Sequence, residues 1–123
     1  MRKILFIEDE AALQEALGEA LRQKGFKVIK ALDGDSGLRL AKSENPDLIL
    51  LDLVLPYKEG FEVLQDLKAD KKTESIPVIV LTNLEGVKDV DRALQAGVTT
   101  YLIKTQYNIE EIIANVKKTL KVK

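Results

Sequence analysis

Five short apolar runs divide the chain, and segments with a different hydrophobic spacing separate them. The runs predict strands at residues 4–7, 26–29, 48–51, 77–81 and 101–103. Between and after them, apolar residues recur every three or four positions, which is typical of helices that bury one face. Taken alone, the run at 48–51 fits either a strand covered on both faces or a short buried helix.

Strand and helix alternate five times, without an internal linker or a low-complexity tract. Alternation of this kind requires a parallel sheet with right-handed crossovers and helices on both of its faces. We therefore expect a single doubly wound α/β domain over residues 1–123, with a five-stranded sheet and five helices. The order of the strands does not follow from the periodicity.

Residues with strong capping preferences mark the ends of several predicted helices. Gly25 suits the C-terminal end of the first helix, and the second begins at 33–36 and stops by 45–46. Asn108 and Glu111 resemble a capping box at the start of the last helix. The apolar faces expected on the first, third, fourth and last helices are Leu13, Ala16, Leu17, Ala20 and Leu21; Phe61, Leu64 and Leu67; Val87, Val90, Ala93 and Leu94; and Ile109, Ile112, Ile113, Val116 and Leu120.

Polar residues follow four of the predicted strands at the point where each run ends. Glu8 and Asp9 follow the first strand, Asp52 the third, Thr82 the fourth and Lys104 the fifth. The carboxyl ends of parallel strands lie on one edge of the sheet, where ligands bind in folds of this type. The sequence therefore predicts that these five residues converge on one small area.

These residue types favour phosphoryl transfer to a carboxylate. Strands disfavour aspartate, and a carboxylate at the mouth of a buried strand must be exposed, paired or bound to a cation, so Asp52 is the candidate nucleophile. Clustered carboxylates repel one another, and Mg²⁺ relieves such repulsion while keeping positions open for phosphate. Lys104 and Thr82 would contact phosphoryl oxygens.

Composition excludes several other kinds of chemistry. The chain has no cysteine and no histidine, so thiol catalysis, disulfides, Ser-His machinery and histidine-ligated zinc are ruled out. Its 19 basic and 20 acidic residues give a net charge of −1, which argues against direct nucleic-acid binding. No apolar run suits a membrane span or a signal peptide, so we expect a cytoplasmic location without membrane insertion.

With these residues in register with the strands, the chain resembles, from end to end, the receiver domain of bacterial response regulators, the CheY-like group. The resemblance implies a flavodoxin-like sheet in the order 2-1-3-4-5. It also implies phosphoryl transfer to Asp52 from the phosphohistidine of a histidine kinase or phosphotransfer protein, with Mg²⁺ or Mn²⁺ as cofactor. The domain would then be a signalling switch rather than an enzyme, with slow autodephosphorylation only.

The same resemblance assigns roles to individual residues. It implies that Asp9 is a direct metal ligand, that Glu8 binds the metal directly or through water, and that Asp52 and the backbone carbonyl of Val54 complete the protein ligands. Thr82 and Lys104 match the switch hydroxyl and the phosphate-contacting lysine. Tyr101 matches the aromatic residue that turns inward when the hydroxyl moves, and Pro56 with Gly60, which marks a turn, matches the loop after the acceptor.

Two departures from the family pattern affect these expectations. Glu8 stands where aspartate is commoner, so its longer side chain favours a water-mediated contact. Thr105 follows Lys104 where many members carry a proline after a cis bond, and a non-proline cis bond costs about 2.5–4 kcal/mol, which favours a trans bond. In the family, the positions two past the acceptor and two past the hydroxyl influence attack by water. Here they are Val54 and Leu84, both apolar, so we expect a slowly decaying phosphoryl form.

Partners follow from the resemblance as well. The surface that the family commonly uses for effector proteins corresponds here to the fourth helix, fifth strand and fifth helix, about Val87 to Leu120. We expect an effector protein on that surface, a monomer or a phosphorylation-dependent dimer, and no output domain within this chain.

Other functions and plainer roles compete with this interpretation. A degenerate receiver would bind partners regardless of phosphate. An aspartyl-phosphate phosphohydrolase needs a second aspartate two residues after the nucleophile, where Val54 stands, and a flavin carrier needs a Ser/Thr-Gly-rich loop that is missing after the first strand. Taken singly, Asp9 or Thr82 could simply cap a helix, and Lys104 or Glu10 could be a solvated charge.

Overall fold

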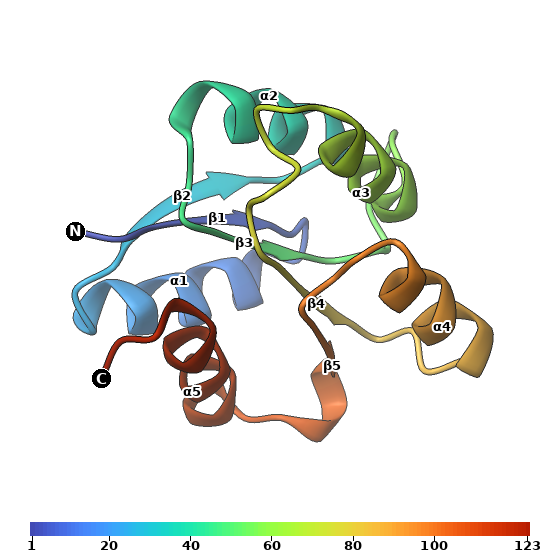
Figure 1. Cartoon of the computed structure of the whole chain (residues 1–123). Coiled ribbons are helices and arrows are strands. Elements are labelled where there is room, and N and C mark those ends of the chain that lie inside the picture. The colour runs from blue at the N-terminus through green and yellow to red at the C-terminus, as the bar shows by residue number, and fades with distance from the viewer.

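The apolar run at residues 48–51 is the middle strand of a five-stranded parallel sheet in the computed structural model, which describes all residues 1–123 (Figure 1). The strands are β1 (Lys3–Ile7), β2 (Lys27–Ala31), β3 (Leu48–Leu51), β4 (Val78–Thr82) and β5 (Thr100–Ile103). Their order is β2-β1-β3-β4-β5, and every neighbouring pair is parallel. The expected flavodoxin-like sheet is therefore confirmed, and residues 48–51 form a strand rather than a buried helix.

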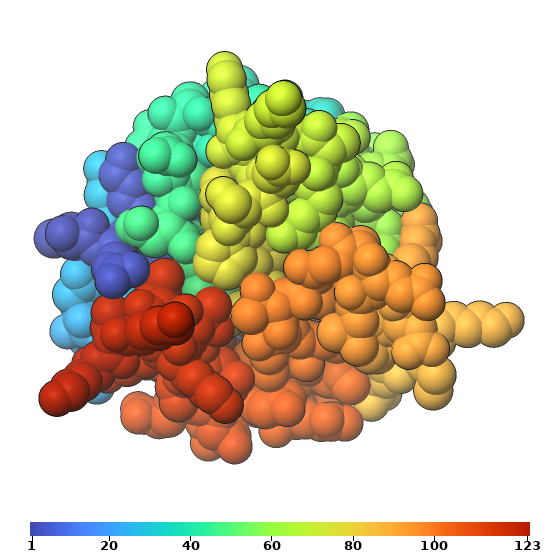
Figure 2. Space-filling model, viewed as in Figure 1, coloured from blue at the N-terminus to red at the C-terminus, as the bar shows by residue number.

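Helices cover both faces of the sheet. They are α1 (Ala11–Gln23), α2 (Gly34–Glu44), α3 (Gly60–Ala69), α4 (Val87–Gln95) and α5 (Ile109–Leu120). Figure 1 shows α1 and α5 on one face and α2, α3 and α4 on the other. Once the side chains are drawn in full, the spaces between these ribbons close (Figure 2). None of the helices has the length and apolar composition needed to cross a membrane.

The alternation of side chains along the strands divides the core into two layers. Leu5, Ile49 and Leu51 point toward α2, α3 and α4, whereas Ile4 and Leu50 point toward α1 and α5. Residues Leu48 to Leu51 are all fully buried, as expected for a strand covered on both faces. The central strand is therefore held from both sides, and its carboxyl end is fixed in position.

The predicted helix caps are present. Asp33 accepts a hydrogen bond from the backbone N–H of Ser36, and the reciprocal capping box between Asn108 and Glu111 is complete. Gly25 follows α1 with φ +93°, a left-handed conformation that glycine adopts without strain. These local contacts explain why the sequence places the helix ends correctly.

Several boundaries and one helix face differ from the sequence expectations. Gly60 is the first residue of α3 rather than part of the preceding turn, and Ala16 is exposed. Val87 and Leu94 of α4 are 75% and 50% exposed, and only Ala93 of that helix is buried. Because α4 packs against the edge strand β5, the sheet does not extend far enough to cover the rest of its apolar face.

The position of Gly60 depends on a close approach of two backbone segments. Its N–H donates to the carbonyl of Leu53 at 3.0 Å. A Cβ atom there would overlap the Cα of Leu53 and lie 2.6 Å from the carbonyl oxygen of Asp52. Any side chain at residue 60 would therefore push the start of α3 away from the end of β3.

We predict that Gly60→Ala lowers the free energy of unfolding by about 2–3 kcal/mol, because the added methyl group overpacks rigid backbone. Gly18→Ala is the matched control, since a Cβ at residue 18 meets only the side chain of Arg22, at 3.6 Å. The control should gain about 0.5–1 kcal/mol from the lower helix cost of alanine. Urea titration measures both, and equal effects in the two variants would contradict the explanation.

Candidate functional site

Strand ends bring the predicted site residues together at one edge of the sheet. Glu8 directly follows β1, and its N–H donates to the carbonyl of Ala31 at 2.9 Å. Asp52 directly follows β3, and its N–H donates to the carbonyl of Ile7 at 3.1 Å. Thr82 is the last residue of β4. Ladder hydrogen bonding thus extends one residue past the apolar runs and sets where Glu8 and Asp52 lie.

Lys104 reaches the same edge from β5, at the start of a short 3-10 turn (η1, Lys104–Gln106). The chain has no cis peptide bond, so the Lys104–Thr105 bond is trans. This geometry still brings the ammonium group to the acidic residues. The departure from the family pattern at Thr105 therefore leaves the lysine within reach of the site.

The acidic residues form a compact cluster in a cleft. Carboxylate oxygens of Glu8, Asp9 and Asp52 all lie within 4.8 Å of one another. Glu8 and Asp52 are buried, whereas Asp9 is exposed. The cleft has a volume of about 370 Å³ and is lined by Glu8, Asp9, Glu10, Asp52, Val54, Asn83 and Lys104.

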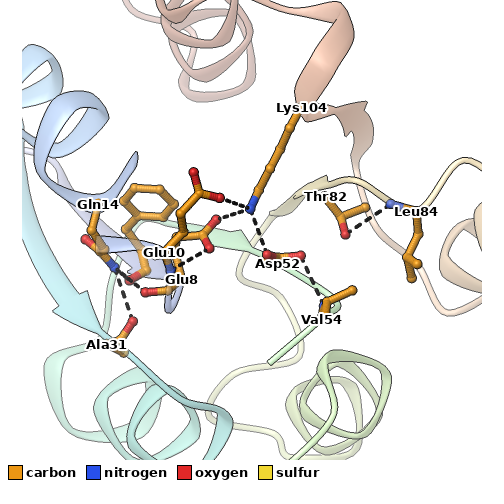
Figure 3. A network of polar contacts seen from close by, with 10 residues as sticks. Glu8, Glu10, Gln14, Ala31, Asp52, Val54, Thr82, Leu84 and Lys104 are labelled. Carbon is orange, nitrogen blue, oxygen red and sulfur yellow. Dashed lines mark hydrogen bonds and ion pairs between the residues drawn. The ribbon is translucent and has the colours of Figure 1, made fainter. Parts of the chain in front are cut away.

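Lys104 is the cation that balances this cluster (Figure 3). Its Nζ lies 2.8 Å from Glu8 Oε1, 2.9 Å from Asp52 Oδ2 and 3.4 Å from Glu10 Oε2. Burial alone would lower the pKa of Lys104, but its close contacts with the carboxylates of Glu8 and Asp52 outweigh burial and raise that pKa. The ammonium group therefore stays protonated and holds carboxylates from two strands together.

Glu8 bears the largest electrostatic cost in the site. Its side chain is fully buried, and burial, with the nearby charge of Asp52, raises its pKa to about 7 despite the opposing contact with Lys104. Although Oε1 forms a close ion pair with Lys104, it has no aligned hydrogen-bond donor. A buried carboxyl group beside two further carboxylates fits a hard divalent cation, whose charge would offset this cost.

The two oxygens of Asp52 face different partners. Oδ1 accepts a hydrogen bond from the N–H of Val54 at 3.1 Å, and Oδ2 is paired with Lys104 at 2.9 Å. The side chain of Val54 is 54% exposed and lines the cleft. The Asp52 carboxylate is thus fixed in orientation at the wall of an open cleft.

Thr82 and Tyr101 meet the loop after β4 rather than the acidic cluster. Thr82 is buried, does not line the cleft, and accepts a long contact of 3.5 Å from the N–H of Leu84. The Tyr101 hydroxyl donates to the carbonyl of Leu84 at 2.8 Å. Burial and the charges of Asp89 and Asp52 raise the pKa of Tyr101 to about 12, so the hydroxyl keeps its proton.

Three polar residues near the site were not predicted for it from the sequence. Glu10 and Asn83 line the cleft, and their only sequence signal is their place beside Asp9 and Thr82. Gln14 is buried beneath the acidic residues and bonds to backbone carbonyls there. The burial of Gln14 could have been predicted from the sequence, because position 14 shares the helical spacing of the buried residues 17 and 21.

Comparison with known proteins agrees with this geometry. The family model "Response regulator receiver domain" matches residues 4–117. The chain is 39% identical over 121 residues to the DNA-binding dual master transcriptional regulator RpaA of Synechocystis, covering 98% of this chain and 50% of that protein. This chain spans about half the length of the curated relatives that it matches.

Two solved structures show the same fold. The CheY-like receiver domain protein of Methanospirillum hungatei has a TM-score of 0.90 and 27% identity, with 98% of this chain and 94% of that chain covered. The receiver domain of the sensor histidine kinase PA1611 from Pseudomonas aeruginosa has a TM-score of 0.88 and 28% identity, with 98% of both chains covered. That structure has a magnesium ion coordinated in its active-site cleft.

This chain belongs to the receiver-domain family of two-component response regulators. Receiver domains are signalling switches of phosphorelays rather than enzymes in the ordinary sense. The cluster of Glu8, Asp9 and Asp52 supports divalent metal binding at the edge of this sheet.

We predict that, in metal-free buffer, the contribution of Glu8 to the free energy of unfolding falls as pH rises from about 4.5 to about 7. The ordinary pKa of Glu8 is 4.5 and its folded pKa is about 7, so in this window the native state binds a proton that the unfolded state lacks. Glu8→Gln should remove this dependence and be more stable above pH 7, by at most about 3 kcal/mol. Urea titrations of both proteins across pH measure the difference, and parallel pH profiles would contradict the prediction.

Proposed function

We propose that this chain acts in a cytoplasmic phosphorelay, where the Asp52 carboxylate accepts a phosphoryl group from the phosphohistidine of a histidine kinase or phosphotransfer protein. The observation that carries the proposal is the meeting of Asp52 with Glu8, Asp9 and Lys104 in one open cleft. Two further carboxylates and one fixed ammonium group form the surroundings that an aspartyl nucleophile requires.

Transfer is an exchange of one bond to phosphorus for another. An oxygen of Asp52 forms the new bond to phosphorus while the bond to the donor imidazole nitrogen breaks, and the electron pair of the broken bond remains on that nitrogen. Lys104, already 2.9 Å from Asp52 Oδ2, would shift its contact to a phosphoryl oxygen. The N–H of Val54 keeps the carboxylate oriented through Oδ1. Positioning and charge account for most of the catalysis in such a reaction.

Mg²⁺ or Mn²⁺ would be held by the side chains of Asp9 and Asp52, by the backbone carbonyl of Val54, and by Glu8 directly or through a water molecule. The ion supplies positive charge that offsets repulsion between the incoming phosphoryl oxygens and the carboxylates. The gathering of carboxylate oxygens of Glu8, Asp9 and Asp52 within 4.8 Å of one another supports this assignment.

The signal would leave the site through the loop after β4. Thr82 and Tyr101 both contact Leu84 there, so movement of the Thr82 hydroxyl toward a phosphoryl group would shift the equilibrium of the Tyr101 ring. The surface from Val87 to Leu120 would then bind an effector protein or a second copy in a phosphorylation-dependent manner. Exposed Val87 and Leu94 on α4 support an interaction role for this surface.

The phosphohydrolase and the degenerate receiver each conflict with particular residues. A phosphohydrolase needs a proton-transferring residue at position 54, and valine has no proton to transfer. A degenerate receiver would not need the ion pairs that hold Lys104 between Glu8 and Asp52. The receiver that uses phosphate therefore remains the favoured function.

We predict that Asp52→Asn abolishes covalent labelling by acetyl phosphate in Mg²⁺, because the carboxamide is not a nucleophile toward phosphorus. Intact mass spectrometry measures the gain of one phosphoryl group. Asp91→Asn is the control, since Asp91 is exposed on α4 and outside the cleft, and it should label like the unchanged protein. Labelling of Asp52→Asn at the normal rate would disprove the role of Asp52.

We also predict a slow decay of the phosphorylated form, because the side chains of Val54 and Leu84 cannot orient a hydrolytic water molecule. Val54→Asn and Leu84→Glu should each shorten the lifetime of the label after the donor is removed. We expect the larger effect at Val54, which lines the acidic cleft, whereas Leu84 lines a neighbouring one. If neither variant accelerates the decay, this explanation of the lifetime is wrong.

A further inference from the structure

Gln14 of α1 is a buried polar residue whose side chain points at the backbone beneath the acidic cluster (Figure 3). It is 3% exposed. Its Nε2 lies 2.7 Å from the carbonyl oxygen of Phe6, 3.2 Å from that of Ala31 and 3.3 Å from that of Glu8. One carboxamide thus joins the end of β1, the end of β2 and the first residue of the acidic turn.

Gln14 also contacts the other end of that turn. Its backbone N–H donates to the carbonyl of Glu10 at 3.0 Å, in the first turn of α1. Glu8, Asp9 and Glu10 are therefore held between the side chain and the main chain of the same residue. The N–H of Glu10 in turn donates to Glu8 Oε2 at 3.1 Å, so the orientation of the Glu8 carboxylate depends on the path of this turn.

The side chain of Gln14 donates to a backbone carbonyl, that of Glu8, which has no other hydrogen-bond donor in the protein. Glu8 lies outside the strands and helices, and its carbonyl accepts no backbone N–H. The donor that reaches it is Gln14. An apolar residue at position 14 would suit the buried face of α1 equally well by hydrophobicity, but it would leave this carbonyl without a partner.

Fixing the turn matters because its residues repel one another. Glu8, Asp9 and Asp52 bring their carboxylates within 4.8 Å of one another before any metal is bound. Without a rigid backbone, Asp9, which is exposed, would turn toward solvent and away from the other two. Metal-ligating carboxylates that are already held close together lose less conformational entropy when they bind a cation.

We propose that Gln14 is a positioning residue for the divalent metal: it clamps the turn of Glu8, Asp9 and Glu10 so that the Glu8 and Asp9 carboxylates face one bound ion. This inference rests on the proposed metal-dependent function and names a residue that does not itself touch the ion. A residue that served only the core would affect stability and leave metal affinity unchanged.

The test is isothermal titration with Mg²⁺ of the full chain and of Gln14→Met, which keeps the length of the side chain and removes its donors. We expect the dissociation constant for Mg²⁺ to rise about tenfold, as when an outer-shell partner of a metal ligand is lost. Thr73→Val is the matched control, because Thr73 is buried and donates to the carbonyl of Leu67 at 2.7 Å, far along the chain from the site.

Each of the two variants loses a buried hydrogen bond, so each should melt a few degrees lower. Only Gln14→Met should bind Mg²⁺ more weakly. Equal Mg²⁺ affinity in Gln14→Met and the unchanged protein would overturn the proposal, and so would an equal loss in Thr73→Val. If the unchanged protein binds no Mg²⁺, the proposed function itself is wrong, which is a separate outcome.

A second measurement separates positioning from chemistry. The Mg²⁺ concentration that gives half-maximal labelling by acetyl phosphate should rise in Gln14→Met by the same factor as the dissociation constant, while labelling at saturating Mg²⁺ stays within about twofold. A fall in the saturated rate with an unchanged half-maximal concentration would contradict a positioning role.

If Gln14→Met does not fold, the unchanged protein still decides the question. In its NMR spectrum, the side-chain amide signals of Gln14 should shift during a Mg²⁺ titration with the same dissociation constant as the backbone amides of Asp9 and Glu10. The exposed amides of Gln65 and Gln95 serve as internal references and should stay in place. A Gln14 signal that does not move while Asp9 and Glu10 titrate would overturn the proposal.

Discussion

The site depends on one electrostatic arrangement, in which a single ammonium group stands among carboxylates that would otherwise separate. Lys104 lies within 2.9 Å of oxygens from both Glu8 and Asp52, which follow different strands. The charge of Lys104 lowers the cost of burying these two acids, and their charges keep Lys104 protonated. A divalent cation or a phosphoryl group entering the cleft would change this balance, which makes the cluster responsive to both.

Buried strands and backbone hydrogen bonds hold the repelling carboxylates in place. The central strands are buried on both faces, and ladder hydrogen bonds extend past them to the N–H groups of Glu8 and Asp52. Below the acidic turn, Gln14 adds side-chain bonds to the same backbone. At the same edge of the sheet, the polar contacts of the loop after β4 are those of Thr82 and Tyr101 with Leu84, which also packs against the core. The strand ends and the acidic turn are thus held by many hydrogen bonds, whereas the loop after β4 has few. This difference suits a domain in which a change of charge at the site changes the conformation of a binding surface.

Sequence periodicity and local caps predicted the strands and helices and their alternation, whereas the strand order followed only from the family resemblance. The exceptions have tertiary causes. Gly60 begins α3 because its backbone touches that of Leu53 and Asp52, a contact that no local pattern encodes. The apolar residues Val87 and Leu94 stay exposed because α4 lies over the edge strand, so their spacing predicted a buried face that the sheet cannot cover.

For the site, the sequence by itself determined which residues follow the buried strands and therefore reach one edge: Glu8, Asp9, Asp52, Thr82 and Lys104. This works because parallel strands fix the direction of every strand end. Only the tertiary structure decided what these side chains contact. It sends Thr82 toward Leu84, adds Glu10 to the cleft and places Gln14 beneath the acidic turn. Such contacts depend on distances between segments far apart in the chain, and those distances are set by packing rather than by spacing.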